Sequence, residues 1–175
     1  TGYMLFKRFN RSISKTSPGV ASQNRPSIIF RLADFYLIYA EVANEVNPSD
    51  SRVLTYLNLV RERAGLPKVE ILNPGIVGNK ELQRAAIQRE RQIELATEGQ
   101  RYFDVRRWMI ADKDGEGRQN GYAHGMNVRG TINDAEEFNR VVETEKIVFN
   151  RKMYLQPIPD HEMRKTQNLV QNPGW

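Results

Sequence analysis

Three glutamates at a regular spacing are the residues of this sequence best placed to do chemistry. Glu90, Glu94 and Glu98 recur every four residues, so a helix would carry their side chains on one face. Carboxylates at this spacing can hold metal ions inside a helical bundle, where Glu-x-x-His pairs complete the site. The chain contains no such pair, and its two histidines, His124 and His161, fall in a loop and at a helix start. We therefore expect no metal and no cofactor.

An ion-pair network explains the same stripe better. Like charges four residues apart repel each other by about 0.2–0.5 kcal/mol per pair, so cations must compensate them. Arginine suits this role because its planar guanidinium can meet a carboxylate with two hydrogen bonds. The candidate partners are Arg91 and Arg101 nearby in sequence, and Arg61, Arg63, Arg106 and Arg107 from neighbouring helices. We expect Glu94 and Glu98 to be at least partly buried and bonded to arginines of this group.

Other fragments that resemble catalytic motifs each lack a required part. His161-Glu162 begins a zinc-protease motif, but Lys165 replaces the second histidine and would repel a metal ion. The glycine-rich stretch 115–121 has no strand before it, and its third glycine comes one place late for a phosphate-binding loop. The chain has no P-loop, no Gly-x-Ser-x-Gly motif and no cysteine. Because no nucleophile is accompanied by a base, we expect a protein that is not an enzyme.

The charge distribution argues against nucleic-acid binding. The net charge is +5 and the isoelectric point is about 9.6, which would suit an anionic partner. However, residues 80–113 contain eight Lys or Arg interleaved with six Asp or Glu, so the basic residues form no continuous stripe. Apolar residues make up 39% of the chain, and no stretch is long and apolar enough to span a membrane. Composition therefore indicates a globular domain with internal ion pairs.

Paired helices are the elements that must position these side chains. Apolar residues recur at three- and four-residue spacings from residue 29 to 46, where Asn47-Pro48 ends the pattern. A second helix is expected from a cap at Ser49 or Asp50 to a stop at Gly65. Further helices are expected over residues 79–98 and 101–111. The fold class predicted is all-α, built from tetratricopeptide-like helical hairpins with long irregular loops.

The remaining segments are expected to be mostly irregular. Residues 1–30 are predicted as a short strand near Tyr3–Phe9 followed by loop, and residues 112–130 as a glycine-rich loop. A helix over 133–142 and a short strand over 146–149 complete the pattern. The aromatic side chains on the helices are expected to pack in the core, and they are Phe35, Tyr36, Tyr39, Phe103 and Trp108.

Five runs of the sequence resemble, in order, the motifs of the SusD/RagB family. Arg31–Glu41 resembles its R-x-A-[DE]-x-x-L-x-Y-A-E helix, and Val60–Leu66 resembles its V-R-x-R-A-G-L ending of the next helix. Arg89–Trp108 is similar to its E-R-x-x-E-L-x-x-E-G-x-R-x-x-D-[LV]-R-R-W signature. Tyr154–Glu162 and Gln171–Trp175 resemble its closing L-x-P-I-P-x-x-E and Q-N-P-G-[YW].

The resemblance implies a function as well as a fold. It implies a non-catalytic protein that binds glycans, or peptides in some members, at the outer face of the outer membrane of Bacteroidetes-type bacteria. It also implies delivery to a SusC-like, TonB-dependent transporter, and membrane contact only through a lipid anchor outside this chain. Since family members are much longer, residues 1–175 are expected to be a C-terminal portion whose N-terminal part is absent.

Any ligand contact within this chain is expected in the predicted loop at residues 112–132. This long, polar segment supplies an aromatic ring, an imidazole and amides, which suit a sugar. The candidate residues are Asn120, Tyr122, His124 and Asn127. A surface insertion without function, or a contact with the transporter, would explain the same composition. A helical protein–protein scaffold without a small-molecule site is the alternative function.

Overall fold

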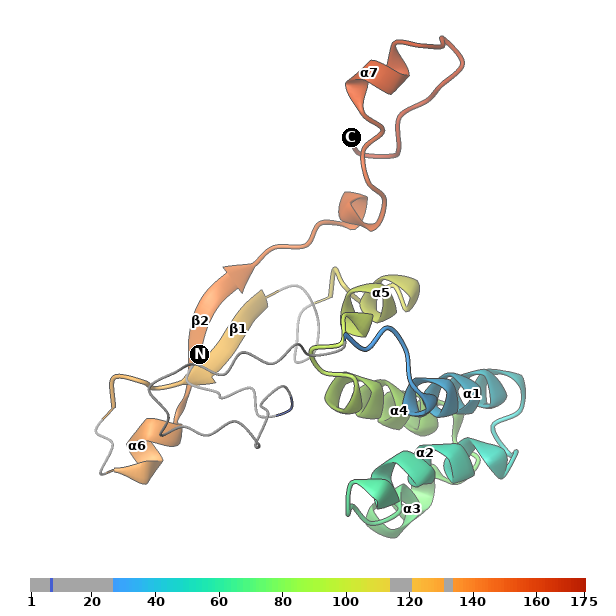
Figure 1. Ribbon diagram of the computed structural model, residues 1–175, viewed down its shortest axis with the longest axis vertical. Coiled ribbons are helices and arrows are strands. Elements are labelled where there is room, and N and C mark those ends of the chain that lie inside the picture. Colours follow the sequence, from blue (N-terminus) through green and yellow to red (C-terminus); the bar gives the residue numbers. More distant parts are fainter. Residues whose placement is uncertain (1–6, 8–26, 114–120, 131–133) are drawn as a thin grey trace. The chain divides into compact units, whose positions relative to one another are not determined.

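The structure is a computed structural model, and it describes residue 7 and residues 27–113, 121–130 and 134–175. These residues are mainly helical and contain one two-stranded sheet, which confirms the predicted fold class (Figure 1). The chain consists of two compact units, one formed by residues 26–107 and the other by residues 1–25 with 108–175. The strand predicted near Tyr3–Phe9 lies outside the described residues.

Residues 26–107 form the helical unit. Its main helices are α1 (Leu32–Val46), α2 (Arg52–Arg63), α4 (Lys80–Glu94) and α5 (Gln100–Arg107). The helices α1 and α2 form a hairpin, and α4 packs against both of them (Figure 1). The segment between α2 and α4, predicted as a loop, contains the short helices α3 (Val69–Leu72) and η2 (Pro74–Ile76).

Local signals in the sequence end or begin these helices as predicted. The side chain of Asn79 accepts a hydrogen bond of 3.2 Å from the backbone N–H of Leu82 and caps α4. At the start of α2 the N-cap residue is Ser51 instead of the predicted Ser49 or Asp50, and Asp50 just before it accepts a hydrogen bond of 2.9 Å from the backbone N–H of Arg52. Gly65 follows α2 with a φ of +78°, a backbone conformation that glycine adopts without steric cost. These caps satisfy backbone groups that helix termini leave unpaired.

A small apolar cluster forms the core of the helical unit. The buried members come from α1, α2 and α4, and they are Leu37, Ala40, Val53, Leu57, Val60 and Ile87. Tyr36 packs against this cluster, partly buried, as predicted. Phe35 and Phe103 were wrongly expected in the core, because their side chains are 54% and 64% exposed. Tyr39 is also 40% exposed. The side of α1 that packs in the core is therefore not the side that carries Phe35 and Tyr39.

A β-hairpin dominates the second unit. Strand β1 (Gly121–Met126) pairs antiparallel with β2 (Val141–Ile147), and α6 (Ala135–Asn139) lies between them in sequence. The loop predicted over 112–130 is therefore wrong for residues 121–126, and the predicted helix and strand that follow had wrong bounds. The reason is that β1 contains two glycines and an alanine, which have low β-propensity, so its pairing with β2 decides the conformation.

The last residues fold back on the segment before them. The indole N–H of Trp175 donates to the backbone carbonyls of Lys152, in η3 (Arg151–Tyr154), and Leu155, each at 3.0 Å. The side chain of Gln171 accepts from the backbone N–H of Ile158 and donates to its carbonyl. The segment also carries one short helix, α7 (Asp160–Met163). None of the described helices has the length and apolar character needed to cross a membrane.

Candidate functional site

The exposed face of β1 brings together two of the residues predicted to bind a ligand. Tyr122 and His124 are two residues apart on the strand, so both side chains lie on one face of the hairpin, and both are exposed. Lys146 on β2 lies opposite Tyr122, and Glu143 lies opposite His124. The ammonium of Lys146 is 5.9 Å from the centre of the Tyr122 ring. The face therefore offers a ring, an imidazole, an ammonium and a carboxylate.

An irregularity in the strand pairing creates this arrangement. The register shifts between Tyr122 and His124, so two residues of β2 oppose the single residue Ala123. The hydroxyl of Thr144, one of those two, donates a hydrogen bond of 2.9 Å to the carbonyl of Ala123 and fixes the bulge. Because of the shift, the residues opposite Tyr122 and His124 are three apart on β2 instead of two.

Asn127, another of the predicted ligand residues, lies beyond the end of this strand. Asn127 follows the end of β1, where its backbone N–H donates to the carbonyl of Arg140 and its carbonyl accepts from Gly130. Its side chain is half-buried. Asn120 lies outside the described residues. The structure thus groups Tyr122 with His124 on a strand instead of in the predicted loop.

The glutamate stripe of α4 lies against arginines of the helical unit. Arg61 donates to Glu90 at 2.8 Å, and Arg63 donates to Glu94 at 2.6 Å, which confirms the predicted partner group for Glu94. The partner found for Glu98 comes from outside that group. Arg31, which the sequence analysis did not consider, binds Glu98 at 2.9 Å and the backbone carbonyl of Glu94 at 2.7 Å. Its hydrogen bond with Glu98 raises the pKa of the Arg31 guanidinium. These carboxylates are engaged by cations.

A second ion-pair cluster joins α1, α4 and α5. The guanidinium of Arg91 is buried and donates to Asp34 and to Asp104, each at 2.8 Å. Arg107 binds Asp104 at 2.9 Å and also Glu41 on α1. Sequence reasoning missed Asp34, Glu41 and Asp104, although all three lie in runs that resemble family motifs.

Arg106, another predicted member of the network, interacts with an aromatic ring. Its guanidinium carbon lies 3.5 Å from the centre of the Tyr102 ring, and its Nη1 donates to the Tyr102 carbonyl. Such a cation–π contact is worth about 0.5–1 kcal/mol where solvent is present. Within the described residues, no group of His, Asp or Glu side chains is placed to hold a metal ion.

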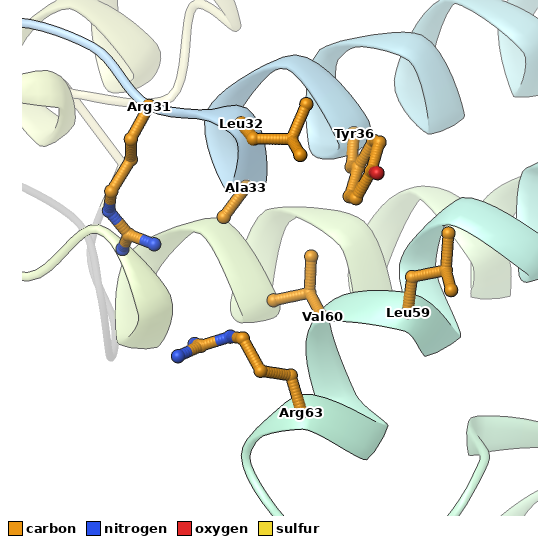
Figure 2. A pocket seen from close by; sticks show the side chains of 7 residues that line it. All are labelled: Arg31, Leu32, Ala33, Tyr36, Leu59, Val60 and Arg63. Carbon is orange, nitrogen blue, oxygen red and sulfur yellow. The ribbon is translucent and has the colours of Figure 1, made fainter.

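Hollows lie on the surface of the helical unit, and two of them are lined by residues that the structure describes. One, of about 250 Å³, opens between the start of α1 and the end of α2 (Figure 2). Leu32 and Tyr36 line it from α1, Leu59 and Val60 line it from α2, and the guanidiniums of Arg31 and Arg63 point toward each other at one end. The other, of about 430 Å³, follows α2 and is lined by hydroxyls, amides and carboxylates that include Ser51, Thr55, Asn58, Glu62 and Glu70.

Known proteins resemble large parts of the chain. The model of the SusD family matches residues 1–175. SusD-like protein P25 of Formosa agariphila is 44% identical over 106 residues, which are 61% of this chain and 19% of P25. SusD-like protein P2 of the same organism is 32% identical over 153 residues, which are 85% of this chain and 26% of P2.

A crystal structure of a SusD-like protein from Bacteroides fragilis has the same fold. It is 31% identical, superposes with a TM-score of 0.67, and covers 85% of this chain and 26% of its own. The chain thus spans about a quarter of the length of these relatives, or less. With the family model matched from the first residue to the last, the chain belongs to the SusD family, as the order of its motifs predicted.

Proposed function

We propose that this chain is part of a non-catalytic protein that binds nutrient glycans at the bacterial surface and delivers them to a TonB-dependent, SusC-like transporter. The observation that carries the proposal is the match of the SusD family model to residues 1–175. The whole protein would be held at the outer face of the outer membrane by a lipid anchor outside this chain. Peptides are the second ligand class that the family implies.

The chemistry of the helical unit supports binding instead of catalysis. A general base must be free to accept a proton from a substrate. Glu90, Glu94 and Glu98 instead bind arginine guanidiniums at hydrogen-bonding distance. Proteins of the SusD family are known as binding proteins. In the helical unit, we assign these ion pairs the structural role of holding neighbouring helices together.

The β-hairpin face is the part of this chain that we assign to ligand contact. A sugar ring presents C–H groups on one side and hydroxyls at its edge. The Tyr122 ring is 48% exposed and can pack against the first, while His124, Glu143 and Lys146 can exchange hydrogen bonds with the second. The small residues Gly121, Ala123 and Gly125 alternate with Tyr122 and His124 along the strand.

Binding measurements on the natural protein that carries this sequence test the proposal. Titration calorimetry against a panel of oligosaccharides and peptides should find a ligand, with no product released. Tyr122→Ala should weaken binding of that ligand about two- to tenfold, since an aromatic contact is worth about 0.5–1.5 kcal/mol. His124→Ala should also weaken it. Val170→Ala, which truncates a side chain that is 82% exposed, is the control and should leave affinity unchanged.

Each result separates one part of the proposal from another. Wild-type affinity in both hairpin variants would remove this face from the ligand surface but leave the family function standing. Binding to a transporter without any affinity for glycans or peptides would favour the scaffold alternative. Product release that a point substitution abolishes would overturn the non-catalytic assignment.

A further inference from the structure

Glu70 is the acidic side chain of the helical unit that no lysine or arginine of the described residues binds. The structure describes all of residues 27–107, and each of the other Asp and Glu side chains in this range binds such a cation. Glu70 lies on the short helix α3, beside α2 (Figure 1). Its carboxylate oxygens accept hydrogen bonds of 2.8 and 3.1 Å from the side-chain amide of Asn58. The ion pairs between helices therefore do not account for this carboxylate.

The amide of Asn58 holds the Glu70 carboxylate in one orientation. Asn58 is only 4% exposed, and its Oδ1 accepts a hydrogen bond of 3.0 Å from the backbone N–H of Val69, at the start of α3. Because both ends of this buried amide are engaged, it fixes α3 and the Glu70 side chain together. A polar side chain that a buried neighbour orients in this way is pre-organised for binding. Each carboxylate oxygen has two lone pairs, so Glu70 keeps acceptor capacity that Asn58 does not use.

Glu70 lines the larger hollow of the helical unit, whose other walls are both polar and apolar. Its volume of about 430 Å³ lies in the range of small-molecule sites, about 300–1,000 Å³. The hydroxyls of Ser49 and Ser51 line it, and Ser51, although it is the N-cap of α2, makes no side-chain capping bond. Apolar side chains line another part, and they are Leu54, Leu59 and Val77. The hollow thus combines a fixed acceptor, hydroxyls that can donate or accept, and an apolar wall.

This combination fits a sugar ring. Two adjacent sugar hydroxyls can donate to the two oxygens of Glu70, and hydrogen bonds to a carboxylate are about twice as strong as those between neutral groups. The serine hydroxyls can exchange hydrogen bonds with the remaining hydroxyls, and the C–H groups of the ring can contact the leucines. A cationic ligand fits less well, because the ammonium of Lys68 lines the same hollow. Resting on the proposed glycan function, we infer that this hollow is a second glycan contact, which holds one sugar residue through Glu70.

Photoaffinity labelling of the natural protein that carries this sequence tests the inference. Diazirine derivatives of hexoses and N-acetylhexosamines are photolysed with the protein, and mass spectrometry locates the labelled peptides. We expect label within residues 49–59 and 68–77. Glu70→Gln should reduce this label about tenfold or more, and Ser51→Ala about two- to tenfold, since a bond to a charged group is the stronger one. Glu81→Gln removes the same charge from a side chain that is 76% exposed and lies outside the hollow, so it should leave the label unchanged.

The position of the label separates this inference from the proposed function. Label on the β-hairpin or elsewhere in the protein, with none at residues 49–77, overturns the second site and leaves the glycan-binding function standing. Equal label at residues 49–77 in the wild type and in Glu70→Gln also overturns it, because the sugar would then not depend on the carboxylate. No label anywhere, together with no affinity for oligosaccharides, contradicts both. Ser51→Ala leaves the contact between Asn58 and Glu70 intact, so it decides the question if Glu70→Gln does not fold.

Discussion

Replacing Arg91 with methionine is expected to destabilise the helical unit by about 3–5 kcal/mol. Its side chain is only 2% exposed, and its two hydrogen bonds of 2.8 Å hold Asp34 of α1 and Asp104 of α5 against α4. Methionine fills similar volume but leaves both carboxylates without this cation in a buried site. The cost arises mainly from the carboxylates that remain, since a buried charge without its partner loses hydration and gains little in return.

The measurement is the free energy of unfolding from urea denaturation, followed by circular dichroism. Arg89→Met is the matched control, because it removes the same charge from an exposed position of the same helix and should change stability by less than about 0.5 kcal/mol. A triple variant with Arg91→Met, Asp34→Asn and Asp104→Asn should recover part of the loss, since it also removes the two buried carboxylates that lose Arg91, of which Asp104 still has Arg107 as a partner.

Equal stability of Arg91→Met and Arg89→Met would refute this reasoning, because it would mean that the buried ion pairs contribute no more than a surface charge. A triple variant less stable than Arg91→Met would refute the account in another way. It would show that the loss does not come mainly from the carboxylates that lose Arg91.

Two further predictions concern carboxylates bound by arginines. Glu94→Ala should lower the melting temperature measurably, since it removes the shared partner of Arg31 and Arg63. An unchanged melting curve would contradict the structural role assigned to Glu94. Glu45 has its pKa lowered to about 2, chiefly by its hydrogen bonds with Arg84. Its stabilisation should therefore be complete above about pH 4.5 and disappear as the pH falls toward 2. Because the pair is partly exposed, the contribution is on the order of 0.5 kcal/mol, and Glu45→Gln should abolish this pH dependence.

Helix positions could be predicted from the sequence because their signals are local. Pro48, Gly65 and Asn79 each act on the backbone within a few residues of themselves, so the order and approximate limits of the four main helices followed from them. The inward face of α1 could not be predicted in this way. The apolar periodicity points to the side of α1 that is exposed. The buried side includes Asp34 and Asn44, which no count of apolar residues would select.

Pairing over long sequence distances explains the other failures. Arg31 binds Glu94 across 63 sequence positions. A search for arginines close to the glutamates in sequence therefore does not find this pair. The β-hairpin joins residues that are 15 to 26 positions apart, and β1 alone is too rich in glycine to show the alternation of a strand. Tyr122 and His124 were selected from the composition of a presumed loop. Only the pairing with β2 puts Glu143 and Lys146 beside them.

The ion pairs and the family-like motifs describe the same feature of this chain. Arg31, Asp34 and Glu41 come from the first motif run, Arg61 and Arg63 from the second, and their partners Glu90, Arg91, Glu94, Glu98, Asp104 and Arg107 from the third. A hydrogen-bonded ion pair between two helices restricts their relative position more than apolar contacts do, because apolar contacts tolerate small shifts. We infer that these motifs fix how α1, α2, α4 and α5 pack. Tyr122 and His124, which we propose for ligand contact, lie outside these motif runs.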